Sequence, residues 1–103
     1  MTSSDQEEAR RELLERLGTA RKAIYQASGW VRGLSADELK PFGIDIKPEV
    51  ADSMDQIVVQ LDEIIGMLDG GRVTDALGLY RYKYPEWKRF FDLAHLLWGK
   101  LNS

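Results

Sequence analysis

The strongest constraint on this chain is an unbroken helical repeat of apolar residues between Arg72 and Leu101. Apolar side chains recur there at steps of three and four, the period of one face of an α-helix. They are Val73, Leu77, Tyr80, Tyr84, Trp87, Phe91, Ala94, Trp98 and Leu101. The repeat keeps its phase across Pro85, where a new element would normally shift it. We therefore predict one long helix from Arg72 to Leu101 with a kink at Pro85.

An earlier amphipathic helix is predicted from Ser4 to Gly33. Ser4 and Glu7 have the spacing of a capping box, in which each side chain bonds a free backbone N–H at the helix start. One apolar stripe then follows along the helix. It consists of Leu13, Leu17, Ala20, Ile24, Ala27, Val31 and Leu34.

A third helix is predicted from Pro48 to Asp69, with Pro48 in the first turn, where a missing N–H costs nothing. Its apolar stripe is Val50, Met54, Ile57, Leu61, Ile64 and Leu68, widened by Val58 and Ile65. The joint at Gly70 and Gly71 is short, so this helix and the last one should form an antiparallel hairpin.

The segment between the first two helices holds a second capping signature, Ser35 with Glu38, which predicts a single helical turn ended by Pro41. Beyond it the apolar residues alternate with other residues, a period of two that is typical of extended backbone. These apolar residues are Phe42, Ile44 and Ile46. We expect a locally extended connector and no sheet, because a lone strand has no partner.

These elements predict an all-α fold: one domain over residues 1–103, built as an antiparallel three-helix bundle with a long, kinked C-terminal helix. Apolar residues make up 44% of the chain and charged residues 30%, which is ordinary globular usage. No run of about 20 apolar residues is present, so we expect no membrane span. The start of the chain lacks a secretory signal pattern, and a cytoplasmic location is the default expectation.

Composition also limits the chemistry. The net charge of -3 disfavours binding to nucleic acid, which needs a clustered basic surface. The chain has no cysteine, which removes thiol catalysis and thiolate metal sites. Aromatic and basic residues do mix around Tyr80 to Arg89, but the helical spacing places Tyr80, Tyr84 and Trp87 on the core stripe.

His95 is the only histidine, so any imidazole chemistry would depend on it. Asp92 lies three residues earlier on the same helical side, and such a pair can bind a metal. A dinuclear helical site would need two such motifs, and this chain has one. We therefore expect no enzyme activity, cofactor or metal, and keep a small metal-binding or phosphotransfer protein using His95 as the alternative.

The last helix carries more apolar surface than one core stripe needs. A second stripe consists of Leu79, Tyr82, Phe90, Leu93 and Leu97. An apolar surface left exposed usually marks an interface, so we predict a protein partner, a homodimer or both through these residues. The other interpretation is that the helix is central and uses both stripes internally.

A further indication comes from an acidic residue and glycine turn followed by Val73, Ala76, Leu79, a Tyr-Pro pair and Trp87. This run resembles the C-terminal half of small helical bacterial proteins associated with flagellar loci, and is broadly similar to flagellar and secretion chaperones. The resemblance implies a non-catalytic interaction module of the adaptor or chaperone-like kind.

Overall fold

The computed structural model describes residues 3–45 and 47–101, and the side chains of residues 5–45 and 47–100. These residues form an all-helical chain, which confirms the predicted class. The elements are α1 (Ser3–Gly33), α2 (Ala36–Leu39), the 3₁₀ turn η1 (Lys40–Phe42), α3 (Lys47–Asp69) and α4 (Val73–Leu101). None of the described helices has the length and apolar run that crossing a membrane requires. The side chain of Ser4 lies outside the described part, so its capping box stays a prediction.

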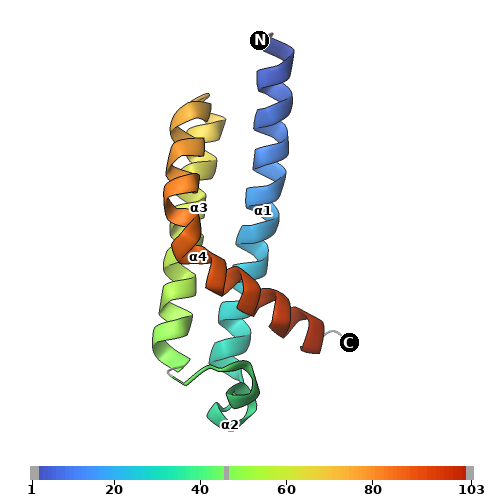
Figure 1. The fold of residues 1–103 in the computed structure, drawn as a ribbon, viewed down its shortest axis with the longest axis vertical. Helices are drawn as coiled ribbons and strands as arrows, with labels where there is room; N and C mark the ends of the chain where they lie inside the picture. Colours follow the sequence, from blue (N-terminus) through green and yellow to red (C-terminus); the bar gives the residue numbers. More distant parts are fainter. Residues whose placement is uncertain (1–2, 46, 102–103) are drawn as a thin grey trace.

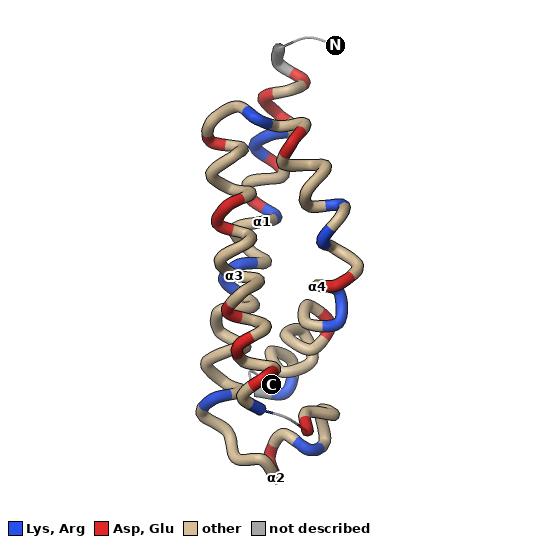
Figure 2. Tube along the Cα trace, turned by 90° about the vertical axis from the view of Figure 1, so that its left-hand side faces the viewer, with Lys and Arg blue, Asp and Glu red and all other residues tan. Residues whose placement is uncertain are grey.

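The three long helices have different courses. α1 and α3 run side by side in opposite directions along the long axis of the molecule (Figure 1). α4 first returns beside α3, then changes direction and crosses α1, so that its second half leads away from the other two helices (Figure 1). Pro85 lies inside this helix. In the view turned by 90°, the middle of α4 stands away from α1 and α3 (Figure 2).

The core is formed by the predicted apolar faces of α1 and α3, and on α4 by Ala76, Trp87, Ala94 and Leu97, of which only Trp87 and Ala94 belong to the first predicted stripe. Its buried side chains come from all three long helices and from the connector, and the largest fully buried ones are Leu17, Ile24, Leu39, Met54, Leu61, Ile64, Leu68, Leu97 and Val31. Burying a leucine or isoleucine side chain of this kind is worth roughly 1.5–3 kcal/mol. Hydrophobic burial therefore supplies the main attraction between the helices.

A row of ion pairs joins α1 to α3 along one side. Three arginines of α1 stand eleven residues apart, about three helical turns, so they share one face. Arg10 lies 3.9 Å from Asp69, Arg21 pairs with Asp62, and Arg32 lies 2.7 Å from Asp55. Such exposed pairs contribute little individually, at most about 1 kcal/mol each. Their common spacing favours one register of α1 on α3.

The buried hydroxyl of Ser28 extends this row into the core. Ser28 Oγ donates a hydrogen bond to Asp55 Oδ1 at 2.6 Å and accepts one from Arg32 Nη1 at 2.5 Å. The Ser28 hydrogen bond, with help from the Arg32 guanidinium, lowers the pKa of Asp55 below its ordinary value. A polar side chain inside the core is thereby satisfied, which avoids a desolvation penalty.

The connector differs in part from its prediction. The capping box of Ser35 and Glu38 is present, with Ser35 Oγ accepting from the Glu38 N–H at 3.2 Å and Glu38 Oε1 accepting from the Ser35 N–H at 3.1 Å. Residues 40–42, however, form a 3₁₀ turn, so the helical turn does not end at Pro41, and the extended backbone expected from Phe42 onward is wrong at Phe42. Gly43 follows at a φ of 74°, a conformation that favours glycine. The expected alternation also included Ile46, which lies outside the described residues.

The joint between α3 and α4 is a glycine-terminated helix end. Gly71 has a φ of 83°, and its N–H bonds to Leu68 O at 3.1 Å. The Arg72 N–H reaches back to Met67 O at 2.8 Å. This is the Schellman arrangement, which satisfies the last carbonyls of a helix and reverses the chain. It starts α4 back along α3, as the sequence predicts.

Candidate functional site

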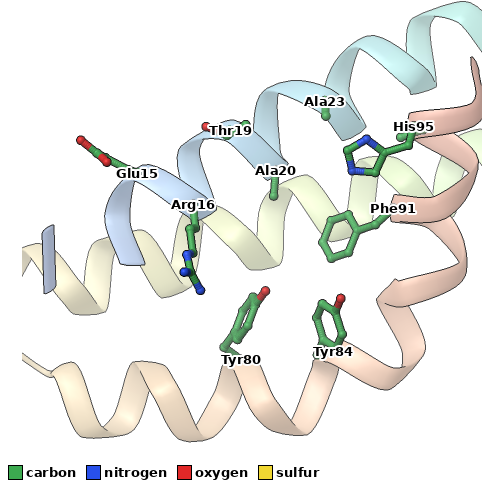
Figure 3. A pocket seen from close by; sticks show the side chains of 10 residues that line it. Glu15, Arg16, Thr19, Ala20, Ala23, Tyr80, Tyr84, Phe91 and His95 are labelled. Atoms are coloured by element: carbon green, nitrogen blue, oxygen red, sulfur yellow. The ribbon is translucent and has the colours of Figure 1, made fainter. Parts of the chain in front are cut away.

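A cleft lies between α1 and α4, on the side where the two helices diverge. Its volume is about 440 Å³, within the roughly 300–1,000 Å³ of ligand sites in proteins. Five side chains from each helix line it (Figure 3): Glu15, Arg16, Thr19, Ala20 and Ala23 of α1, and Tyr80, Tyr84, Phe91, Ala94 and His95 of α4.

The two walls of the cleft are chemically different. On α1 the wall consists mainly of the small side chains of Thr19, Ala20 and Ala23, which leave space between the helices. On α4 the rings of Tyr80 and Tyr84 rise toward α1, with their hydroxyl groups leading (Figure 3). A wall of small side chains, called the smooth wall below, therefore faces an aromatic wall, and the space between the two can receive an apolar group.

The aromatic wall is a connected cluster of rings. The centroids of Tyr80 and Tyr84 lie 5.5 Å apart, and those of Tyr84 and Phe91 lie 5.9 Å apart. Trp87 supports the cluster from the core, with its ring centroid 6.2 Å from that of Tyr80. The indole Nε1 of Trp87 donates a hydrogen bond to Gln60 Oε1 of α3 at 3.0 Å. Because the rings brace one another, the wall is preorganised for contact.

The cleft continues into a second hollow of about 220 Å³. The two hollows share Thr19, Ala23, Ala94 and His95, and the second adds Lys22, Gln26 and Trp98. Trp98 packs against Trp30 of α1 with ring centroids 5.8 Å apart, yet it remains 48% exposed. A groove with aromatic groups at both ends therefore runs along α1.

Few charged groups reach the groove. Arg16 extends toward Tyr80 across the first hollow (Figure 3), whereas Glu15 lies at its outer edge with its side chain pointing away from Tyr80. Burial, followed by the nearby Tyr84, raises the pKa of Tyr80, and Arg16 acts in the opposite direction. The Tyr80 hydroxyl is therefore neutral near pH 7 and can act as a hydrogen-bond donor. Lys22 borders the second hollow.

His95 lines both hollows and its side chain is exposed. Asp92, the other half of the predicted pair, is held by Lys88 at 3.0 Å on the same helix. Over residues 3–45 and 47–101, no group of three or more histidine, aspartate or glutamate side chains is arranged to hold a metal ion. The metal-binding and phosphotransfer alternative thus gains no second residue from the structure.

The five residues predicted at an interface do not share one exposed face. Leu97 is fully buried in the core, which corrects its expected place at the surface, because the second half of α4 turns that side toward the other helices. Leu79, Phe90 and Leu93 are half-buried and pack against the core. Tyr82 alone of the five is largely exposed, at 74%. Self-association through this set stays a prediction, with Tyr82 as its accessible member.

The sequence did not identify the cleft, although its aromatic wall was visible as the first stripe of the last helix. Its spacing predicts core positions, because helical periodicity cannot distinguish a ring that packs against another helix from a ring that lines a cleft. Comparison with protein-family models, with curated proteins and with solved structures gave no match. Any function of the cleft therefore has to be inferred from the residues that line it.

Proposed function

We propose that this protein is a non-catalytic helical interaction module, of the adaptor or chaperone-like kind, that associates through α4. The observation that carries this proposal is the aromatic cleft between α1 and α4. It is open to solvent and lined by Tyr80, Tyr84 and Phe91. Tyrosine and tryptophan dominate the energetic centres of protein interfaces because they combine large apolar area with few rotatable bonds.

The polar groups of the cleft favour binding over catalysis. Acid-base or nucleophilic chemistry needs at least two groups held together in a productive geometry. Within the described part of the chain, no hydrogen bond or ion pair joins His95 to an ionisable side chain, and its neighbour Asp92 bonds to Lys88. The remaining polar groups of the lining, such as Arg16 and Thr19, can orient an apolar partner by hydrogen bonds at its edge.

We further propose that the three long helices act as one antiparallel bundle and that Pro85 sets the kink of α4. A proline inside a helix removes one backbone hydrogen bond and clashes with the preceding turn, which bends the helix. Support comes from the change in direction of α4 seen in Figure 1. Pro85→Ala should straighten α4 and change the width of the cleft. Paramagnetic or fluorescence distance measurements between α1 and the end of α4 would register this.

A photo-cross-linking residue placed in the cleft tests the interaction role. Benzoylphenylalanine at position 84 replaces a tyrosine that is 37% exposed at the mouth of the cleft. The same residue at position 25 or 59 replaces Tyr25 or Val59, which are more exposed and do not line the cleft. After irradiation in the source cells, we expect protein adducts from position 84 and far fewer from the controls. Equal yields at all three positions would contradict the proposed function.

A further inference from the structure

The molecule has more surface than a compact monomer of its size. Its accessible surface is 6846 Å², about 900 Å² above the roughly 5,900 Å² expected for a folded monomer of this mass. Its radius of gyration is 15.4 Å, compared with about 12.8 Å for a compact domain of this length. Each partner in an interface of standard size buries about 800 Å². The excess is therefore of the size that one interface would cover.

We propose that a second copy of this chain occupies the α1–α4 cleft, and that the two copies pack cleft to cleft about a two-fold axis. This inference rests on the proposed function and names the partner. A two-fold contact is the commonest closed arrangement of identical chains, because the same patch serves on both sides.

The apolar part of the cleft suits a copy of itself. Each copy offers partly exposed rings, Tyr84 at 37% and Trp98 at 48%, and a smooth wall around Ala20 and Ala23. When the two clefts face each other, the rings of one copy can enter the space beside the small residues of the other. Alternation of large and small side chains across a contact is what close packing requires.

The charged rim of the cleft is self-complementary. Arg16 extends toward Tyr80 (Figure 3), so the α1 turn that holds Glu15 lies level with the α4 turn that holds Tyr80 and Arg81. Further along the groove, Lys22 of α1 and His95 of α4 border the second hollow. His95 lies one helical turn after Asp92. Along α1, the outer edge of the groove therefore carries Glu15 and then Lys22, with Arg16 reaching into the first hollow. Along α4, helical spacing places Arg81 and then Asp92, which is paired with Lys88, to one side of the aromatic wall.

In either two-fold arrangement, this order of charges places the acidic Glu15 opposite a basic residue of the partner. With the axis parallel to α1 and to the first half of α4, α1 lies over the first half of the partner's α4, and Glu15 meets the partner's Arg81. With the axis perpendicular to them, α1 lies over the partner's α1, and Glu15 meets the partner's Lys22. Glu15 is thus opposite a cation in both cases. Such complementarity selects a partner and suppresses like-charge contacts.

Sedimentation velocity of the purified protein over a concentration series tests the inference. We expect a reversible monomer–dimer equilibrium that weakens at least tenfold in Tyr84→Asp, because a carboxylate would be buried among rings. Tyr82→Asp is the matched control on the opposite side of α4, at a site 74% exposed. It should leave the equilibrium unchanged if the cleft is the contact, whereas a dimer that weakens in Tyr82→Asp and not in Tyr84→Asp would overturn the inference and favour the second stripe. Melting curves of dilute samples show whether each variant still folds.

Reversal of rim charges tests the inference without touching the core. Glu15→Arg should weaken the dimer about tenfold, since the altered pair occurs twice and becomes repulsive. Adding Arg81→Glu should restore association if the axis is parallel to the helices, and adding Lys22→Glu should restore it if the axis is perpendicular. Either rescue supports a cleft-to-cleft dimer. Glu63→Arg, an exposed reversal on α3, serves as the control.

Two results would overturn the inference. One is failure of both second substitutions to rescue Glu15→Arg. The other is a parent protein that sediments as a monomer at several hundred micromolar, which would assign the cleft to a different molecule. The interaction role itself would survive in that case if position 84 still cross-linked to other proteins in cells. The two proposals therefore fail by different measurements.

Discussion

The two contacts of α1 contrast with each other. Toward α3, α1 presents an apolar stripe bordered by arginines that meet four aspartates, and the contact is closed between Leu17 and Val31. Toward α4, the same helix presents Ala20 and Ala23 to a wall of rings, and a groove remains. Two straight helices with matching stripes can close on each other, whereas a helix that changes direction can follow its neighbour only part of the way. We therefore propose that a partner binds at the open contact, the cleft between α1 and α4.

The largest expected effect belongs to the closed contact. Leu61 of α3 is fully buried, and Leu61→Ala would leave a cavity that the surrounding side chains fill only partly. We expect a loss of about 2–5 kcal/mol in the free energy of unfolding. Val59→Ala, at a site 58% exposed on the same helix, should change stability by no more than about 0.5 kcal/mol. Urea unfolding followed by circular dichroism measures both, and a similar loss in the two variants would break the comparison.

A pair of identical substitutions on α1 compares the closed core with the open cleft directly. Ala27 is fully buried, so Ala27→Leu should overpack the core and cost about 1–3 kcal/mol. Ala23 lines both hollows of the cleft, so Ala23→Leu should find room and leave the stability of the monomer nearly unchanged. Thermal unfolding of dilute protein would show the difference. Equal losses would mean that the cleft is as tightly packed as the core.

The smallest expected effect concerns the polar edge of the closed contact. Asp55→Asn weakens the bonds to Ser28 and Arg32 and should cost about 1 kcal/mol near neutral pH. Asp52→Asn is the control, because Asp52 contacts Arg32 at 3.0 Å but is 72% exposed. It should cost less than about 0.5 kcal/mol.

The Asp55 effect should also depend on pH. The folded protein lowers the pKa of Asp55 below its ordinary value of 3.8. A carboxyl with a lowered folded pKa stabilises the fold above its unfolded pKa, and this contribution is lost as the pH falls through the folded pKa. The stability difference between parent and Asp55→Asn should therefore be constant from pH 5 to 7 and shrink below pH 4. A difference that grew in acid would contradict the assigned cause.

The sequence by itself determined the helices and most of the core. Steps of three and four residues specify which side of a helix is apolar, so the ranges of α1, α3 and α4 and buried residues such as Leu61 and Leu68 followed from local order alone. The glycine joint and the Ser35 capping box were equally local, because their hydrogen bonds connect residues close together in the chain. The pairing of α1 arginines with α3 aspartates was not predicted, since it joins residues up to 59 positions apart.

Only the tertiary structure decided which apolar surfaces stay open. The last helix has two apolar stripes, and periodicity ranks them equally. The course of α4 after its change of direction buries Leu97 from the second stripe and leaves Tyr84 and Trp98 of the first partly exposed. Exposure depends on where a neighbouring helix ends up, and that is set by the packing of the whole chain. The cleft between α1 and α4 is therefore a property of the fold, although every residue that lines it stands in a helix that the sequence predicted.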